Sequence, residues 1–79
     1  MTQQEINQYF LNNGYTETEL NTFVDSTGEF TFVTDPEQVE FLYPDYSAVI
    51  LNSFVTNQTV LANWISKVEY DATHPPVME

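Results

Sequence analysis

The chain has 79 residues, so it forms one small domain at most, because a chain this short buries only about 60% of the surface that its unfolded form exposes. Twelve acidic residues against one lysine and no arginine give a formal net charge of -11. Proteins that bind nucleic acids neutralise phosphates with Lys and Arg, so this composition excludes direct binding of DNA or RNA. The length also excludes a multidomain enzyme.

The composition predicts a chain that folds without covalent help. Hydrophobic residues make up 42% and aromatic residues 15% of the sequence, which separates it from the aromatic-poor, highly charged chains that stay disordered. No cysteine is present, so neither a disulfide nor a thiolate metal site forms. The first residues lack the positive region and long apolar run of a signal peptide. We therefore expect no membrane partner and a cytoplasmic location, which is the host cytoplasm if a phage encodes the chain.

The first predicted element is a helix over residues 3–13. Thr2 and Glu5 have the spacing of a capping box, in which each side chain binds the other residue's backbone N–H. Ile6 and Phe10 follow at helical spacing, and Gly14 is a suitable stop just past the last turn.

The same signals predict a second helix over residues 17–26. Thr16 and Glu19 repeat the capping-box spacing, and Gly28 marks the end. The apolar face of this helix would consist of Leu20, Phe23 and Val24. A short connection to the first helix favours an α-hairpin or a perpendicular corner.

Residues 30–43 have two interpretations. The segment is rich in β-branched and aromatic residues, and its second half alternates, which indicates a β-hairpin with its turn at residues 34–37. Asp35, Pro36 and Gln38 also match the N-cap, first position and capping-box partner of a helix. We favour the helix and keep the hairpin as the alternative. Pro44 ends either element, because it restricts the residue before it.

The last part of the chain predicts a second helical pair and a tail. No acidic residue occurs from 46 to 68, and two amphipathic segments are expected at residues 45–55 and 58–70. Asn57 is the expected N-cap of the later helix. The predicted fold is therefore mainly α, a bundle of four to five short helices over residues 1–70. With the hairpin at residues 30–43, the alternative fold class is α+β; an extended tail is expected at residues 71–79.

The chemistry-bearing residues do not predict an enzyme or a metal protein. His74 is the only side chain that ordinarily titrates near neutral pH, and it lies in the expected tail. The segment from Asp25 resembles an oxygen-rich calcium loop, but Gly28, Phe30 and Pro36 occupy the wrong positions for an EF-hand. We expect no catalytic residue, no metal site and no cofactor.

The charge distribution is the most informative feature of the sequence. Eight of the twelve acidic residues lie between positions 17 and 45: Glu17, Glu19, Asp25, Glu29, Asp35, Glu37, Glu40 and Asp45. If these carboxylates share a patch of roughly 20 Å, their charge density approaches that of duplex DNA, which has one charge per about 1.7 Å of its axis. In size, acidity and lack of basic residues the chain is similar to the DNA-mimic inhibitors that phages and mobile elements use. The simpler interpretation is that the acidic residues only keep the protein in solution.

The function predicted from these features is binding of a basic protein. Tyr43 and Tyr46 lie beside Glu40 and Asp45, so they would add aromatic contacts to the carboxylate patch. We expect a non-enzymatic protein, a monomer or small homo-oligomer, that inhibits a nucleic-acid-binding protein by occupying its basic surface. The alternative is a small structural or assembly subunit, such as a virion or complex component, that binds through its apolar C-terminal half. In that case the apolar face of residues 58–70, which contains Leu61, Trp64 and Ile65, would be partly exposed.

Overall fold

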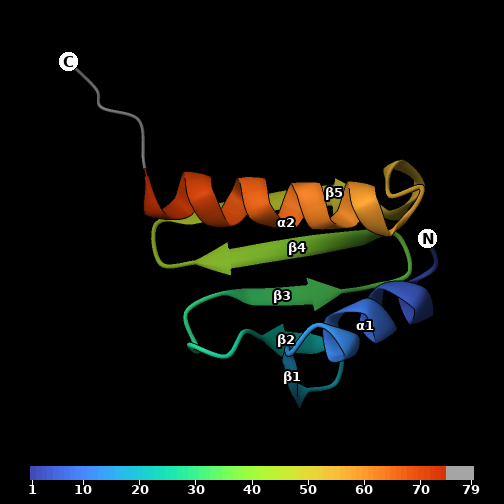
Figure 1. The fold of residues 1–79 in the computed structure, drawn as a ribbon, viewed down its shortest axis with the longest axis horizontal. Coiled ribbons are helices and arrows are strands. Elements are labelled where there is room, and N and C mark those ends of the chain that lie inside the picture. Colours follow the sequence, from blue (N-terminus) through green and yellow to red (C-terminus); the bar gives the residue numbers. More distant parts are fainter. Residues whose placement is uncertain (75–79) are drawn as a thin grey trace.

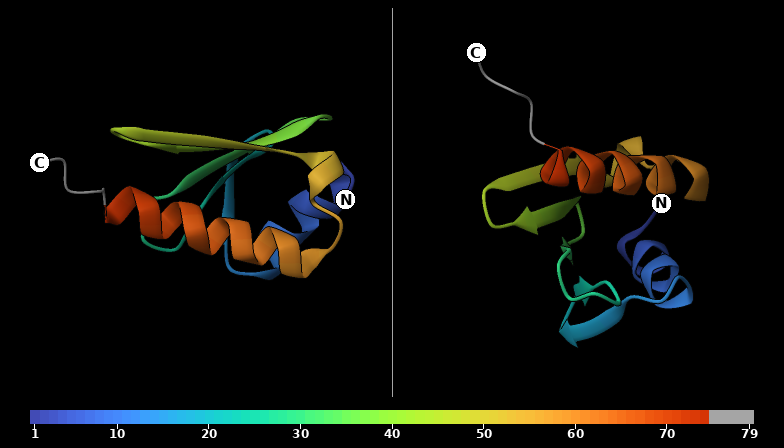
Figure 2. Two further views of the ribbon diagram at one scale, coloured as in Figure 1. Left: turned by 90° about the horizontal axis from the view of Figure 1, so that it is seen from above. Right: turned by 60° about the vertical axis from the view of Figure 1, so that its left-hand side comes forward.

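The computed structural model describes residues 1–74, which form a five-stranded antiparallel sheet with two helices on one of its faces (Figures 1 and 2). The strands follow one another in the sheet as they do in the chain, in the order β1-β2-β3-β4-β5. The elements are α1 (Gln3–Asn12), β1 (Thr16–Glu19), β2 (Thr22–Val24), β3 (Thr31–Thr34), β4 (Gln38–Tyr43), β5 (Tyr46–Leu51), a 3-10 helix η1 (Asn52–Phe54) and α2 (Gln58–Thr73). The fold is α+β, so the predicted bundle of four to five helices is wrong.

Residues 17–26 form most of a β-hairpin instead of the predicted second helix. Strands β1 and β2 pair from Thr16 opposite Val24 to Glu19 opposite Thr22, with a bulge between Glu17 and Glu19. Thr18, Thr22 and Val24 of this segment are β-branched, and such side chains fit a pleated sheet better than a helix. The helical spacing of its apolar residues was misleading.

Residues 30–43 form the second hairpin, so the favoured helix is wrong and the alternative is correct. Phe32 of β3 lies opposite Phe41 of β4. The Asp35 carboxylate accepts hydrogen bonds from the backbone N–H groups of Glu37 and Gln38, at 2.7 and 2.8 Å. An aspartate makes similar contacts at a helix N-cap and in a turn, which explains why the sequence favoured a helix here.

Residues 45–55 form strand β5 and the single turn η1, so the predicted helix in this segment is also wrong. Tyr43 pairs with Tyr46 across a two-residue turn, Pro44 and Asp45. Along β5, half-buried and exposed residues alternate, which is the pattern of a strand with one face against the core.

The two helices of the structure are the first and last predicted helices, and both are confirmed. Both hydrogen bonds of the capping box at the start of α1 are present. The Thr2 hydroxyl accepts from the backbone N–H of Glu5 at 3.2 Å, and the Glu5 carboxylate accepts from the backbone N–H of Thr2 at 2.9 Å. The Asn57 side chain accepts from the N–H of Val60 at 3.0 Å and begins α2. Residues 71–73 continue α2, and residues 75–79 of the expected tail lie outside the described residues.

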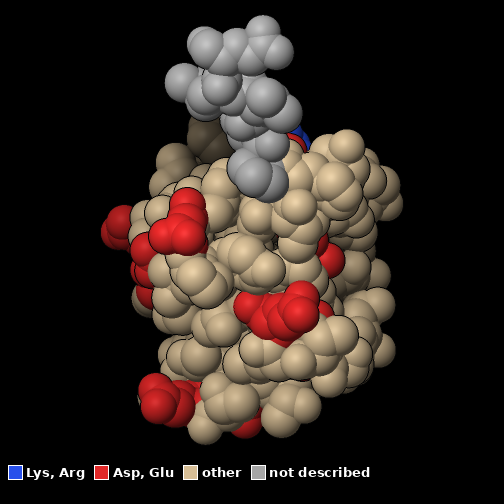
Figure 3. All heavy atoms as spheres, turned by 90° about the vertical axis from the view of Figure 1, so that its left-hand side faces the viewer, with Lys and Arg blue, Asp and Glu red and all other residues tan. Residues whose placement is uncertain are grey.

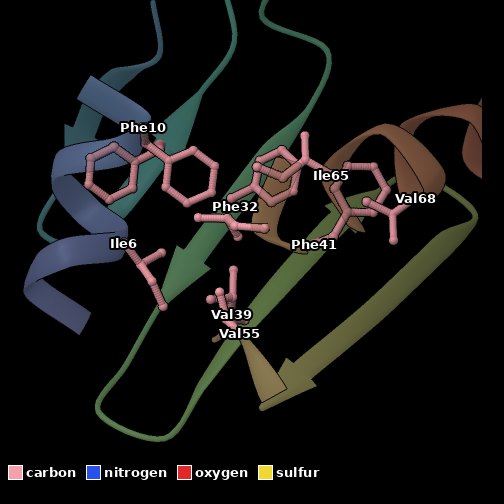
Figure 4. Close-up of a cluster of buried hydrophobic side chains, with 10 residues drawn as sticks. Ile6, Phe10, Phe32, Val39, Phe41, Val55, Ile65 and Val68 are labelled. Carbon is pink, nitrogen blue, oxygen red and sulfur yellow. The ribbon is translucent and has the colours of Figure 1, made fainter. Parts of the chain in front are cut away.

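The core lies between the sheet and the helices (Figure 4). Phe23, Phe32 and Phe41 are directly opposite one another on three neighbouring strands, and all three are fully buried. The Phe10 ring of α1 lies 5.2 Å from that of Phe23 and 5.1 Å from that of Phe32. Helix α2 adds Leu61, Ile65 and Val68 at the spacing of one helix face. Neither described helix is long and apolar enough to cross a membrane.

Candidate functional site

The acidic residues lie at both ends of the sheet rather than in one patch. Successive turns of an antiparallel meander alternate between its ends, so the β2–β3 and β4–β5 turns share one end, while the β1–β2 and β3–β4 turns share the other. The first end has Asp25, Glu29 and Asp45, and the second has Glu19, Asp35 and Glu37. Glu17 and Glu40 lie within β1 and β4. The six residues of β4 separate the two ends by roughly 20 Å. On the face drawn in Figure 3, the acidic side chains form separate groups.

Within residues 1–74, no carboxylate forms an ion pair with Lys67 or the amino terminus. A folded chain with this many unpaired negative charges repels itself, and the repulsion opposes its compact state. The exposed carboxylates at both ends are therefore free to attract an external cation or a basic protein.

Tyr43 and Tyr46 are only partly accessible to a partner at their end of the sheet. Both tyrosines are half-buried against the core, since Tyr43 stacks on Phe30 at 5.4 Å and Tyr46 lies 6.0 Å from Phe41. The carboxylate of Asp25 is occupied by the turn, where it accepts from the backbone N–H groups of Glu29 and Phe30. In residues 1–74, no three acidic or histidine side chains come close enough to hold a metal ion.

A half-buried carboxylate also lies toward this end of the molecule. The Tyr15 hydroxyl donates to Glu69 Oε2 at 2.9 Å and connects the loop after α1 to α2. Burial raises the pKa of the Glu69 carboxyl; the hydrogen bond from Tyr15 opposes this effect and the charge of Asp25 adds to it. Burial also raises the pKa of Tyr15, and Glu69 raises it further. This pair positions α2, and we assign it a structural role.

The opposite end of the sheet contains an open hollow of about 970 Å³, which we call the amide hollow. It lies where the start of α1, two turns and η1 meet. Amide and hydroxyl groups dominate its wall, and no acidic or basic side chain lines it. Its lining residues are Met1, Thr2, Gln3, Gln4, Asn7, Asn21, Pro36, Asn52, Ser53, Val55 and Thr56.

Hydrogen bonds between distant segments hold the amide hollow in shape. Asn7 Nδ2 of α1 donates to Asn21 Oδ1 in the β1–β2 turn at 3.0 Å. Asn52 donates to the β3–β4 turn twice, from its backbone N to the Glu37 carbonyl at 2.8 Å and from Nδ2 to the Asp35 carbonyl at 3.0 Å. Its buried Oδ1 has no hydrogen-bond partner among the described residues. The wall is therefore fixed before any partner arrives, which lowers the entropic cost of binding.

Carboxylates lie directly beside this wall. Asp35 and Glu37 flank Pro36, which lines the hollow. The Glu17 carboxylate accepts from the backbone N–H of Asn21 at 2.9 Å. Four of the predicted partner-binding residues, including Glu19 next to this turn, thus come together at the end of the amide hollow.

The two most exposed large hydrophobic side chains are also at this end. Leu20 is 85% exposed and precedes Asn21, which lines the hollow. Phe54 is 66% exposed and stands between the lining residues Ser53 and Val55. Exposed apolar side chains beside a polar wall are typical of protein interfaces.

The sequence did not reveal the amide hollow. Leu20 and Phe54 occur at helical spacing in their predicted segments, and this placed them in a core. The polar residues of the wall come from four segments that only the folded sheet brings together. A usable signal was Asn21, because asparagine adopts the left-handed conformation of tight turns more readily than most residues, and its φ is 61° here.

No protein-family model matches this chain, and no curated protein or solved structure matches it.

Proposed function

We propose that the protein is a non-enzymatic binding protein that docks onto the basic surface of another protein through the end containing the amide hollow. One observation carries the proposal: the two most exposed large apolar side chains, a fixed polar wall and carboxylates that form no ion pair within residues 1–74 adjoin at this place. The opposite end is also acidic, but its tyrosines are half-buried in the core.

The three parts of this surface suit different groups of a basic partner. Leu20 and Phe54 would enter apolar pockets, as the anchors of many interfaces do. Glu37, which is exposed, would meet Lys or Arg side chains and speed the encounter at low salt. The amides of the wall would bond to backbone or polar groups of the partner.

The biological effect that we propose is inhibition of a nucleic-acid-binding protein in the cytoplasm. Such proteins have basic surfaces because they must neutralise phosphates. The carboxylates beside the amide hollow, those of Glu17, Glu19 and Glu37, would occupy phosphate-binding positions of that surface. Competition with nucleic acid for that surface is the expected mechanism.

The experiment is capture of binding proteins on the immobilised chain, followed by competition with duplex DNA. Glu37→Lys is the test variant, and Glu29→Lys is its matched control, since both change one exposed turn glutamate. We expect a partner that high salt and DNA release, and at least tenfold weaker binding by Glu37→Lys than by Glu29→Lys, a difference of about 1.4 kcal/mol. Equal weakening by the two variants would contradict docking at the amide hollow, and a partner that neither salt nor DNA releases would contradict the basic-surface proposal.

The alternative function, an assembly subunit, requires a different surface. Leu61 and Ile65 of α2 are buried in the core and Trp64 is half-buried, so the apolar face of α2 is not open to a partner. The large apolar side chains exposed in the described C-terminal half are Leu42, Val49, Leu51, Phe54 and Tyr70, and Val49 and Leu51 lie on strand β5.

A further inference from the structure

Strand β5 has one free edge. It is the last strand of the sheet and pairs with β4 on one side only. Within residues 1–74, no hydrogen bond reaches the backbone of residues 46–51 from the other side. Alternate backbone N–H and C=O groups of this strand therefore point outward and are available to another strand.

The two edges of the sheet differ in their protection against strand pairing. Natural edges are usually short, charged, bulged or interrupted by proline. Strand β1 has three of these features, because it has four residues, contains Glu17 and Glu19, and is bulged between them. Strand β5 has six residues, no charge, no proline and no bulge. Only β5 has the features of a pairing edge.

We infer that β5 pairs antiparallel with β5 of a second copy of this chain. Two copies of one strand can pair antiparallel around a two-fold axis, so this interface needs no partner with a different sequence. Charge favours this edge over the other, because β5 contains no charged residue whereas β1 contains Glu17 and Glu19; Glu40 of β4, opposite Val49, lies one strand away from the interface. A basic partner, by contrast, would find no carboxylate on β5.

The exposed side chains of β5 fit such a pair. Val49 and Leu51 are 49% and 42% exposed, and they alternate with Ala48 and Ile50, which pack against the core, so they lie on the face of the sheet away from the core. Pairing centred on Val49 places it beside Val49 of the second copy and places Leu51 opposite Ser47 of the second copy. Two five-stranded sheets then become one sheet of ten strands. A single strand pair buries less than the roughly 1,200 Å² of a standard interface, so the dimer is weak.

The test is sedimentation equilibrium of the full chain from about 10 µM to about 1 mM, the range in which a small interface associates. We expect the mass to rise from 9.1 kDa toward twice that value. Raising the salt should strengthen the dimer, because it screens the repulsion between the two acidic chains. Val49→Lys should abolish the dimer, and Thr18→Lys, which adds the same charge to the other edge strand, should preserve it.

Circular dichroism checks that each variant is folded, and Leu51→Lys replaces Val49→Lys if the latter unfolds. A chain that stays monomeric at the highest concentration and salt overturns the inference. A dimer that survives both β5 variants, or one that Thr18→Lys breaks, also overturns it. The result is independent of the proposed function, since Val49→Lys should leave the Glu37-dependent binding unchanged.

Discussion

Phe32→Ala and Phe54→Ala together test whether the sheet or a helical bundle is the fold of this chain. The Phe32 ring is fully buried, and its centre lies 5.1 Å from that of Phe10 and 5.0 Å from that of Phe41. Removing a buried phenylalanine costs about 3–5 kcal/mol. A chain of this length has about 4–12 kcal/mol of stability in all, at about 0.05–0.15 kcal/mol per residue. Phe32→Ala should therefore remove a quarter or more of the stability.

Phe54 is 66% exposed, so its substitution should cost far less. Full burial of such a side chain contributes about 1.5–3 kcal/mol, and the buried third of Phe54 accounts for about 0.5–1 kcal/mol. Urea unfolding of both variants, read by circular dichroism, measures the two costs. Equal losses would refute the sheet, because the predicted helix over residues 45–55 would have placed Phe54 in the core.

Further predictions concern charge and capping. Burial raises the pKa of Glu69, so the stability that its protonated form contributes is present at low pH and lost as the pH rises through the raised value. Glu69→Gln should flatten the fall of the melting temperature that begins above about pH 4, the ordinary range of a glutamate, and should keep the hydrogen bond from Tyr15. Unchanged pH dependence would contradict the burial of this carboxylate. Thr2→Ala should cost about 1 kcal/mol in urea unfolding, since it breaks the capping box of α1; no cost would mean that the cap is not formed. Adding salt should raise the melting temperature by screening the repulsion between carboxylates, and a fall would indicate stabilising ion pairs, which residues 1–74 do not form among themselves.

Local signals predicted where the two helices start, but they did not predict the sheet. The capping box at Thr2 and the N-cap at Asn57 depend only on neighbouring residues, and both helices start where these signals place them. Strand pairing depends on partners elsewhere in the chain. Leu20 and Phe23 are three residues apart, as on a helix face, yet one lies in a turn and the other on the buried face of β2.

In the candidate site too, the sequence predicted local features and missed those that depend on distant segments. The sequence identified Asp35 and Glu37 as acidic neighbours, and the structure places them together in one turn. It did not identify the division of the acidic residues between two ends, because that depends on which turns share an end of the sheet. Nor did it identify the wall of the amide hollow, which needs Asn7, Asn21 and Asn52 to meet across the fold.

The most direct test of the proposed function is an NMR titration of the isotope-labelled chain with a lysine-rich peptide, compared with the same peptide carrying glutamine in place of lysine. We predict that the lysine peptide shifts the amide signals of Leu20, Asn21, Ser53 and Phe54, that salt reverses the shifts, and that the glutamine peptide does not produce them. Shifts confined to Asp25, Glu29 and Asp45 at the opposite end, or spread equally over every acidic residue, would contradict docking at the amide hollow.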